Sequence, residues 1–209
     1  MPQPNTNTRH SFVYFLAAYA VIGCVVFAAS IFVADQMVPN HDWIADTISD
    51  LAAGELEFIV DAGLYVFSSS LTAIALLAAH VHLGDRWWSV GILGFALFGL
   101  IVFLIGARDE YGDGDNEGFV IHYYLVYAIG ALMTGLPLMM MSGAARVHAR
   151  YRSAFVAIST VWTISAPVFF IMSDDLDGVY ERYLGCISIV FVCLMADMFV
   201  RWCRLRNAT

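Results

Sequence analysis

Long apolar runs dominate the pattern of this chain. Six of them approach or reach the roughly 20 residues that an α-helix needs to cross a hydrocarbon core about 30 Å thick. None shows the strict alternation of a barrel strand, and each contains few charges. The pattern predicts an all-α, polytopic bundle of six transmembrane helices, at about residues 12–33, 58–79, 88–107, 119–141, 154–172 and 183–202.

The composition agrees with a membrane protein. Of the 209 residues, 60% are hydrophobic and only 13% are charged, and the mean hydropathy is +0.73, outside the range of ordinary soluble domains. The first apolar run is too long for the h-region of a signal peptide, which predicts an uncleaved first helix. Short loops and the lack of a linker predict one transmembrane domain over residues 1–209.

The charges predict an orientation. The chain has no lysine, and short loops rich in arginine stay on the cytoplasmic side of a membrane. With the N-terminus inside, all arginines except Arg108 and Arg182 lie inside, and all acids except Asp85 and Asp197 lie outside. We therefore expect both termini to be cytoplasmic and the acidic loops to lie outside.

The first outer loop contains signals for a helix of its own. Thr47 can cap a helix whose third residue is Asp50, and Gly54 can end it. These signals predict a short interfacial helix over residues 48–53, across the outer mouth of the bundle.

A polar stripe follows the second predicted span at helical spacing. Asp61, Tyr65, Ser68 and Thr72 recur on one face, which should point into the bundle rather than toward lipid. Two interpretations stay open: hydrogen bonding between helices, or the wall of a polar cavity that opens outward.

The second outer loop resembles half of a calcium loop. Asp113, Asp115 and Glu117 alternate as hard oxygen ligands would, but the twelfth position is Tyr124 instead of the bidentate glutamate. A full EF-hand is excluded, which leaves either a weak divalent-cation turn or a solvated acidic loop.

His122 lies near the outer end of the fourth predicted helix, where an ionisable group needs a partner or a function. Asp50, Asp61 and Asp109 are expected at the same level. A histidine with two or three carboxylates can hold zinc with an open position for water, which is the chemistry of a hydrolytic site. The alternative is a histidine hydrogen-bonded to one carboxylate.

The two outer arginines need anionic partners. Arg108 and Arg182, the latter beside Glu181, are expected either in ion pairs or against an anionic ligand such as a lipid phosphate. No histidine pair suits haem, and no glycine-rich loop suits a nucleotide. We expect membrane lipids as partners, and no nucleic acid.

Three segments resemble a known family. "ISDLAAGE", "IHYYLVYAIG" and "GVYERYLG" are similar to the bacterial and archaeal six-helix membrane family called domain of unknown function 998. The I-S-D element also resembles the Frag/DRAM/Sfk membrane proteins, some of which are linked to lipid remodelling. The first resemblance implies a six-helix fold in the cytoplasmic (inner) membrane of a prokaryote, without an established activity. It marks Ser49, Asp50, Asp109, His122, Glu181 and Arg182.

Two functional hypotheses follow. In the first, an outward-facing pocket built from Asp50, Asp61, Asp109 and His122 binds a divalent metal (zinc or calcium) or a lipid head group, and hydrolysis of a lipid is a chemistry to test. In the second, the chain is a non-catalytic scaffold subunit that packs against another membrane protein. Transport is a third class, but the sequence shows no inverted repeat or pair of broken helices to favour it.

Overall fold

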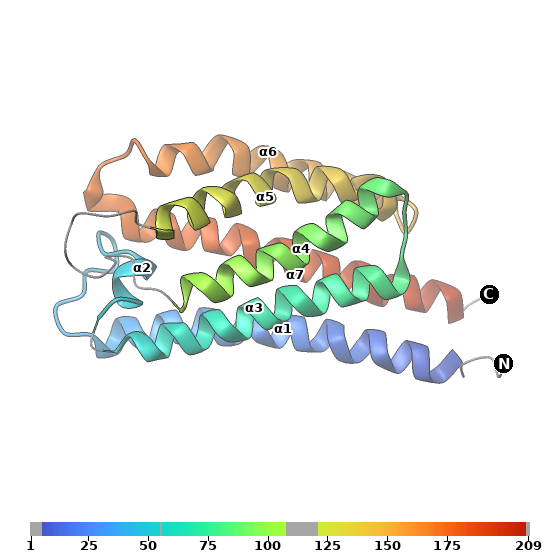
Figure 1. The fold of residues 1–209 in the computed structure, drawn as a ribbon, viewed down its shortest axis with the longest axis horizontal. Helices are drawn as coiled ribbons and strands as arrows, with labels where there is room; N and C mark the ends of the chain where they lie inside the picture. Colours follow the sequence, from blue (N-terminus) through green and yellow to red (C-terminus); the bar gives the residue numbers. More distant parts are fainter. Residues whose placement is uncertain (1–5, 55, 108–120, 208–209) are drawn as a thin grey trace.

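The computed structural model describes residues 6–54, 56–107 and 121–207, and within them every regular element is helical (Figure 1). Helices form here because a chain in lipid must satisfy its backbone polar groups within the protein, and an α-helix does so along almost all of one segment. The elements in chain order are α1 (Thr6–Met37), α2 (Ile48–Leu51), α3 (Glu57–Val81), α4 (Arg86–Ile105), α5 (Ile121–Ala145), α6 (Ala149–Phe169), the 3-10 helix η1 (Asp174–Leu176) and α7 (Asp177–Asn207).

Six of these helices are long and apolar enough to cross a membrane, which confirms the predicted all-α six-span bundle. Helices α1 and α7 exceed their predicted apolar cores at both ends, whereas α6 begins five residues earlier and ends three residues earlier than predicted. The start of α1 and the end of α7 lie at the same end of the bundle, and α2 lies across the opposite end (Figure 1).

The helices pack mainly against their neighbours along the chain. Helix α1 packs on α3, α3 on α4, α4 on α5, and α5 on α6. Helix α7 returns through the middle and packs on α1, α6 and α3. Within the described residues, α5 makes at most a marginal contact with α7, so these two helices stand apart along part of their length.

A layer of aromatic side chains fills the bundle on the side away from α2. Phe191 packs against Phe95 and Phe155, with ring centroids 5.2 and 5.3 Å apart. Trp88 is fully buried and donates from Nε1 to the Ala78 carbonyl at 2.9 Å. These contacts join α3, α4, α6 and α7 into one core.

The polar stripe on α3 faces α4. Tyr65 donates to the Gly106 carbonyl at 2.6 Å, and Ser68 donates to the Gly99 carbonyl at 2.7 Å. Gly99 permits this close approach, because a Cβ there would lie 3.0 Å from the Ser68 carbonyl oxygen. Hydrogen bonding between helices is thus the correct interpretation for Tyr65 and Ser68, whereas Thr72 donates to the Ser68 carbonyl of its own helix. Tyr65 and Thr72 are exposed, so the prediction that the whole stripe points into the bundle was wrong. The cavity described below is lined by Leu64 and Phe67.

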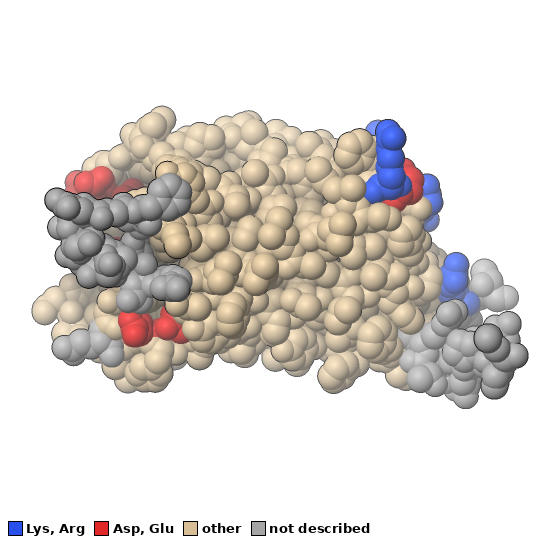
Figure 2. All heavy atoms as spheres, viewed as in Figure 1, with Lys and Arg blue, Asp and Glu red and all other residues tan. Residues whose placement is uncertain are grey.

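Opposite charges gather at opposite ends of the bundle (Figure 2). At the end where α1 begins, which we call the basic end, Asp85 caps α4 by accepting from the backbone N–H of Trp87 at 3.0 Å. His148 caps α6 in the same way, and Arg150 pairs with Asp197 at 2.8 Å. The α2 end, which we call the acidic end, holds the remaining described carboxylates, both in its loops and in the adjoining ends of α1, α3 and α7.

Candidate functional site

The loop between α1 and α3 is shaped by a capping box at the acidic end. Thr47 Oγ1 accepts from the Asp50 backbone N–H at 3.0 Å, and the Asp50 carboxylate accepts from the Thr47 backbone N–H at 2.8 Å. This pair satisfies N–H groups that a helix start leaves open. The predicted interfacial helix is confirmed, although it ends at Leu51 rather than at Ala53.

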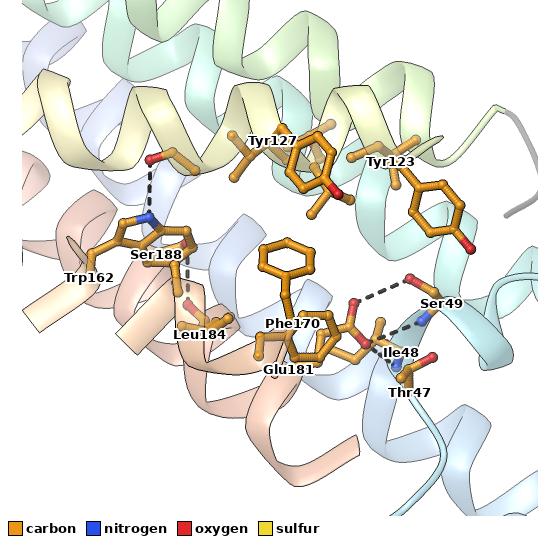
Figure 3. Close-up of a pocket in the computed structure, with 18 of the residues that line it drawn as sticks. Thr47, Ile48, Ser49, Tyr123, Tyr127, Trp162, Phe170, Glu181, Leu184 and Ser188 are labelled. Atoms are coloured by element: carbon orange, nitrogen blue, oxygen red, sulfur yellow. Dashed lines mark hydrogen bonds between the residues drawn. The ribbon is translucent and has the colours of Figure 1, made fainter. Parts of the chain in front are cut away.

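Glu181, in the second turn of α7, completes the N-terminus of α2. Its Oε2 accepts from the Ile48 backbone N–H at 2.5 Å and from the Ser49 backbone N–H at 3.4 Å, while Oε1 accepts from Ser49 Oγ at 3.2 Å (Figure 3). A carboxylate suits this position because it only accepts and because helix N-termini attract negative charge. Glu181 therefore fixes α2 over the bundle.

Arg182, the next residue, is buried on the other side of α7. It donates to the Asp46 carbonyl at 2.9 Å, meets His41 Nε2 at 3.1 Å and pairs with Asp35 at 3.5 Å. Its guanidinium also lies over the Trp43 ring, 5.2 Å from the ring centre. Of the two uses expected for Arg182, the structure shows the ion pair.

Two backbone hydrogen bonds strengthen the same attachment. Gly178 N–H donates to the Ala45 carbonyl and Val179 N–H donates to the Ile44 carbonyl, both at 3.0 Å. These N–H groups belong to the first turn of α7 and have no partner within their own helix. The loop before α2 is thus joined to α7 by backbone and side chain together.

A cavity of about 1020 Å³ lies below α2, inside the bundle. All six long helices contribute to its wall, and it occupies the region where α5 and α7 stand apart. Tyr127 of α5 and Phe170, just after α6, face each other at its side with ring centroids 5.2 Å apart (Figure 3).

The cavity wall is divided into a polar end and an apolar remainder. The polar end is formed by Thr47 and Ser49, at the start of α2, and by Glu181 of α7 (Figure 3). Deeper polar groups are already satisfied by backbone: Trp162 Nε1 donates to the Gly130 carbonyl at 3.1 Å, and Ser188 donates to the Leu184 carbonyl at 3.4 Å. The deep wall therefore presents mainly carbon to an occupant.

His122 belongs to this cavity. Its side chain is 6% exposed, and its Nε2 lies 3.4 Å from Ser49 Oγ. Asp50 and Asp61 are not among the described residues that line the cavity. The structure brings His122 together with Ser49 and Glu181, from α5, α2 and α7.

The metal hypothesis stays a prediction. The described residues contain no group of three or more His, Cys, Asp and Glu side chains placed to hold a metal ion. Asp109, one of the four proposed ligands, lies outside the described residues, and so do Arg108 and the calcium-like turn of Asp113, Asp115 and Glu117.

Ser49, His122 and Glu181 are the residue types of a nucleophilic triad, but their hydrogen bonds follow a different pattern. In such a triad the acid holds Nδ1 of the histidine, so that Nε2 can take the proton of the serine. Here the acid accepts from the serine itself, and His122 Nδ1 has no hydrogen-bond partner among the described residues. The arrangement is suited to holding a polar group.

Sequence reasoning did not find Asp174 and Asp177 as cavity residues. Both come from the turn that leads into α7, and their acidic neighbours made them indistinguishable from a solvated loop. The available signal was the position of Asp177 four residues before Glu181, which places both on one face of a helix.

Six membrane-spanning helices around an amphipathic cavity define an integral membrane protein with an internal cavity open to a ligand. The chain belongs to the family described as "Protein of unknown function (DUF998)", whose model matches residues 21–197 and so includes every described side chain that lines the cavity. A search of the curated proteins and a search of the solved structures each gave no match.

Proposed function

We propose that this protein binds a membrane lipid in the central cavity, with the head group at the polar end beneath α2 and the acyl chain along the apolar wall. The observation that carries the proposal is the division of one continuous wall into these two parts. The volume of about 1020 Å³ is at the upper limit of ordinary ligand pockets, which span about 300–1,000 Å³.

A lipid suits the cavity better than a water-soluble ligand does. Pockets for small polar molecules surround the ligand with polar groups that fix its orientation, whereas here such groups stand at one end only. Helices α5 and α7 do not pack closely, which leaves room between them for an acyl chain inside the bundle. Binding is the proposed activity, since the hydrogen bonds among Ser49, His122 and Glu181 favour binding of a polar group over covalent catalysis.

The proposal includes an orientation. We put the acidic end outside and the basic end in the cytoplasm, in the cytoplasmic membrane of a prokaryote. The support is the distribution of arginine: Arg86, Arg146, Arg150, Arg152, Arg201, Arg204 and Arg206 belong to the segments at the basic end, and Arg182 is used internally at the other. Lipids of the outer leaflet would then meet the polar end of the cavity first.

Adjacent residues of α7 provide the test. Gly185 lines the cavity, and a Cβ there would meet no atom within 4 Å, so Gly185→Leu should fill the cavity without disturbing the helix. Cys186 is exposed and is not part of the wall, which makes Cys186→Leu the matched control. Native mass spectrometry in mild detergent would measure the co-purified lipid.

We expect the unmodified protein and Cys186→Leu to retain a bound lipid and Gly185→Leu to lose most of it. Equal retention in all three proteins would place any bound lipid outside the cavity and refute the proposal. A protein free of lipid that purifies with a second membrane protein would instead favour the scaffold hypothesis.

A further inference from the structure

Two residues that line the cavity each have a buried side-chain atom without a partner among the described residues. These atoms are Nδ1 of His122 and Oδ1 of Asp177. Buried polar groups in proteins are nearly always hydrogen-bonded, so a pair left open in one cavity calls for an explanation. A ligand that satisfies both atoms is the simplest one.

The hydrogen bonds around His122 determine what Nδ1 can do. Ser49 has one hydroxyl proton, and it is donated to the carboxylate of Glu181, which can only accept. Ser49 Oγ must therefore accept from Nε2–H of His122, 3.4 Å away. In a neutral imidazole with its proton on Nε2, Nδ1 carries a lone pair and is an acceptor.

Both open atoms are thus acceptors, because Asp177 Oδ1 is a carboxylate oxygen. An occupant that satisfies them must donate at least two hydrogen bonds. A phosphate or carboxylate head group cannot do so, whereas an ammonium has three donors and a polyol has several.

The charge of the wall separates these two remaining classes. Every charged residue that the structure describes in the wall is acidic, namely Asp174, Asp177 and Glu181. Arg182 is close in sequence, but its guanidinium is turned to Asp35, His41 and the Asp46 carbonyl. The aromatic faces of Tyr123, Tyr127 and Phe170 add sites that attract a cation.

We propose that the cavity selects a lipid whose head group ends in a primary ammonium, with His122 Nδ1 and Asp177 Oδ1 as the acceptors of its N–H groups. This inference rests on the proposed lipid-binding function and adds the class of head group. Glu181 contributes negative charge at the same end while it stays bonded to α2.

The test compares amphiphiles with one chain and three different heads: dodecylamine, dodecanol and dodecyl phosphate. Each competes, at equal mole fraction in the same detergent micelles, with a fluorescent lipid bound to the full-length protein. We expect dodecylamine to displace the fluorescent lipid about tenfold more effectively than dodecyl phosphate, with dodecanol between them, since hydrogen bonds to charged groups are the stronger ones.

Two variants assign the preference to the site. Asp177→Asn keeps the shape of the side chain but removes its charge, so the preference for the amine should fall about tenfold while binding of dodecanol stays within about twofold. Asp175→Asn is the matched control, because Asp175 is exposed in the same turn and does not line the cavity. This variant should keep the full preference.

The outcomes separate the two proposals. Displacement by dodecyl phosphate as effective as by dodecylamine would overturn the head-group class and leave lipid binding intact. An equal loss of preference in both variants would trace it to surface charge and overturn the assignment to the cavity. Failure of all three amphiphiles to displace the fluorescent lipid would likewise overturn the head-group class. Failure of the fluorescent lipid to bind the unmodified protein, or equal binding by Gly185→Leu, would remove the lipid-binding proposal itself.

Discussion

Gly178 offers the sharpest test of how the acidic end is held together. It lies in the first turn of α7 against the loop that precedes α2. A Cβ at this position would lie 2.2 Å from the Asp46 carbonyl oxygen and 2.9 Å from Arg182 Nη1. Because carbon and oxygen approach comfortably only to about 3.3 Å, Gly178→Ala requires the loop to move by roughly 1 Å.

That displacement acts on three hydrogen bonds at once. They are the two backbone bonds from Gly178 and Val179, at 3.0 Å each, and the bond from Arg182 to the Asp46 carbonyl at 2.9 Å. Complete loss of all three would cost roughly 3–6 kcal/mol, and overpacking that relaxes in part typically costs about 1–3 kcal/mol. We expect Gly178→Ala to lower the free energy of unfolding by about 2–4 kcal/mol.

Gly185→Ala is the control in the same helix. A Cβ at Gly185 meets no atom within 4 Å, so this variant reports only the gain in helix propensity, up to about 1 kcal/mol. Unfolding by dodecyl sulfate in mixed micelles, followed by circular dichroism, measures both variants. If Gly178→Ala proves as stable as Gly185→Ala, the loop does not pack on α7 as described and the reasoning is refuted.

Three further predictions concern ion pairs, the cap and metal. Asp35→Asn should destabilise the protein by about 3 kcal/mol or more, because Asp35 and Arg182 form a buried ion pair whose side chains are 8% and 9% exposed. Asp197→Asn should change stability by less than about 1 kcal/mol, because the side chains of Arg150 and Asp197 are 51% and 54% exposed. Thr47→Ala removes one side of the capping box and should cost about 1 kcal/mol in the same unfolding assay. Treatment with a chelator should leave lipid retention unchanged if hydrogen-bond acceptors alone hold the head group. The metal hypothesis would instead be supported if the protein contained stoichiometric metal and if chelation and His122→Ala each removed both the metal and the lipid.

The parts of the fold that could be read from the sequence are those decided locally. Each membrane span follows from the length of one apolar run, and α2 follows from Thr47 and Asp50, three residues apart. The end of α6 was less predictable: the apolar run continues to Met172, but the helix ends at Phe169. Hydropathy marks what can lie in a membrane, whereas backbone geometry decides where a helix ends.

The site was less predictable because its contacts are long-range. Ser49 and Glu181 are 132 positions apart, and no local pattern reveals that α7 returns beneath α2. The polar stripe on α3 also shows that a local pattern does not predict which helix a residue will contact. Its spacing correctly placed Tyr65 and Ser68 on one face of a helix, but Tyr65 is exposed rather than turned into the bundle. Which neighbour the face would meet, α4 rather than a cavity, depended on the packing of helices. The resemblance to a family marked Ser49, His122 and Glu181 without saying why they belong together.

The attachment of α7 to the first loop has a consequence for how the protein is made. Its hydrogen bonds and ion pair join residues 132 to 147 positions apart, from the beginning and the end of the chain. Because membrane proteins are synthesised and inserted from the N-terminus, Asp35, His41 and α2 must wait in the lipid interface until the last helix arrives. A chain in which only the first five long helices have inserted has most of the apolar wall of the cavity. It lacks Glu181 and Arg182 of α7, which hold α2 and the loop before it at the polar end. The polar end of the cavity is therefore completed only when α7 has inserted.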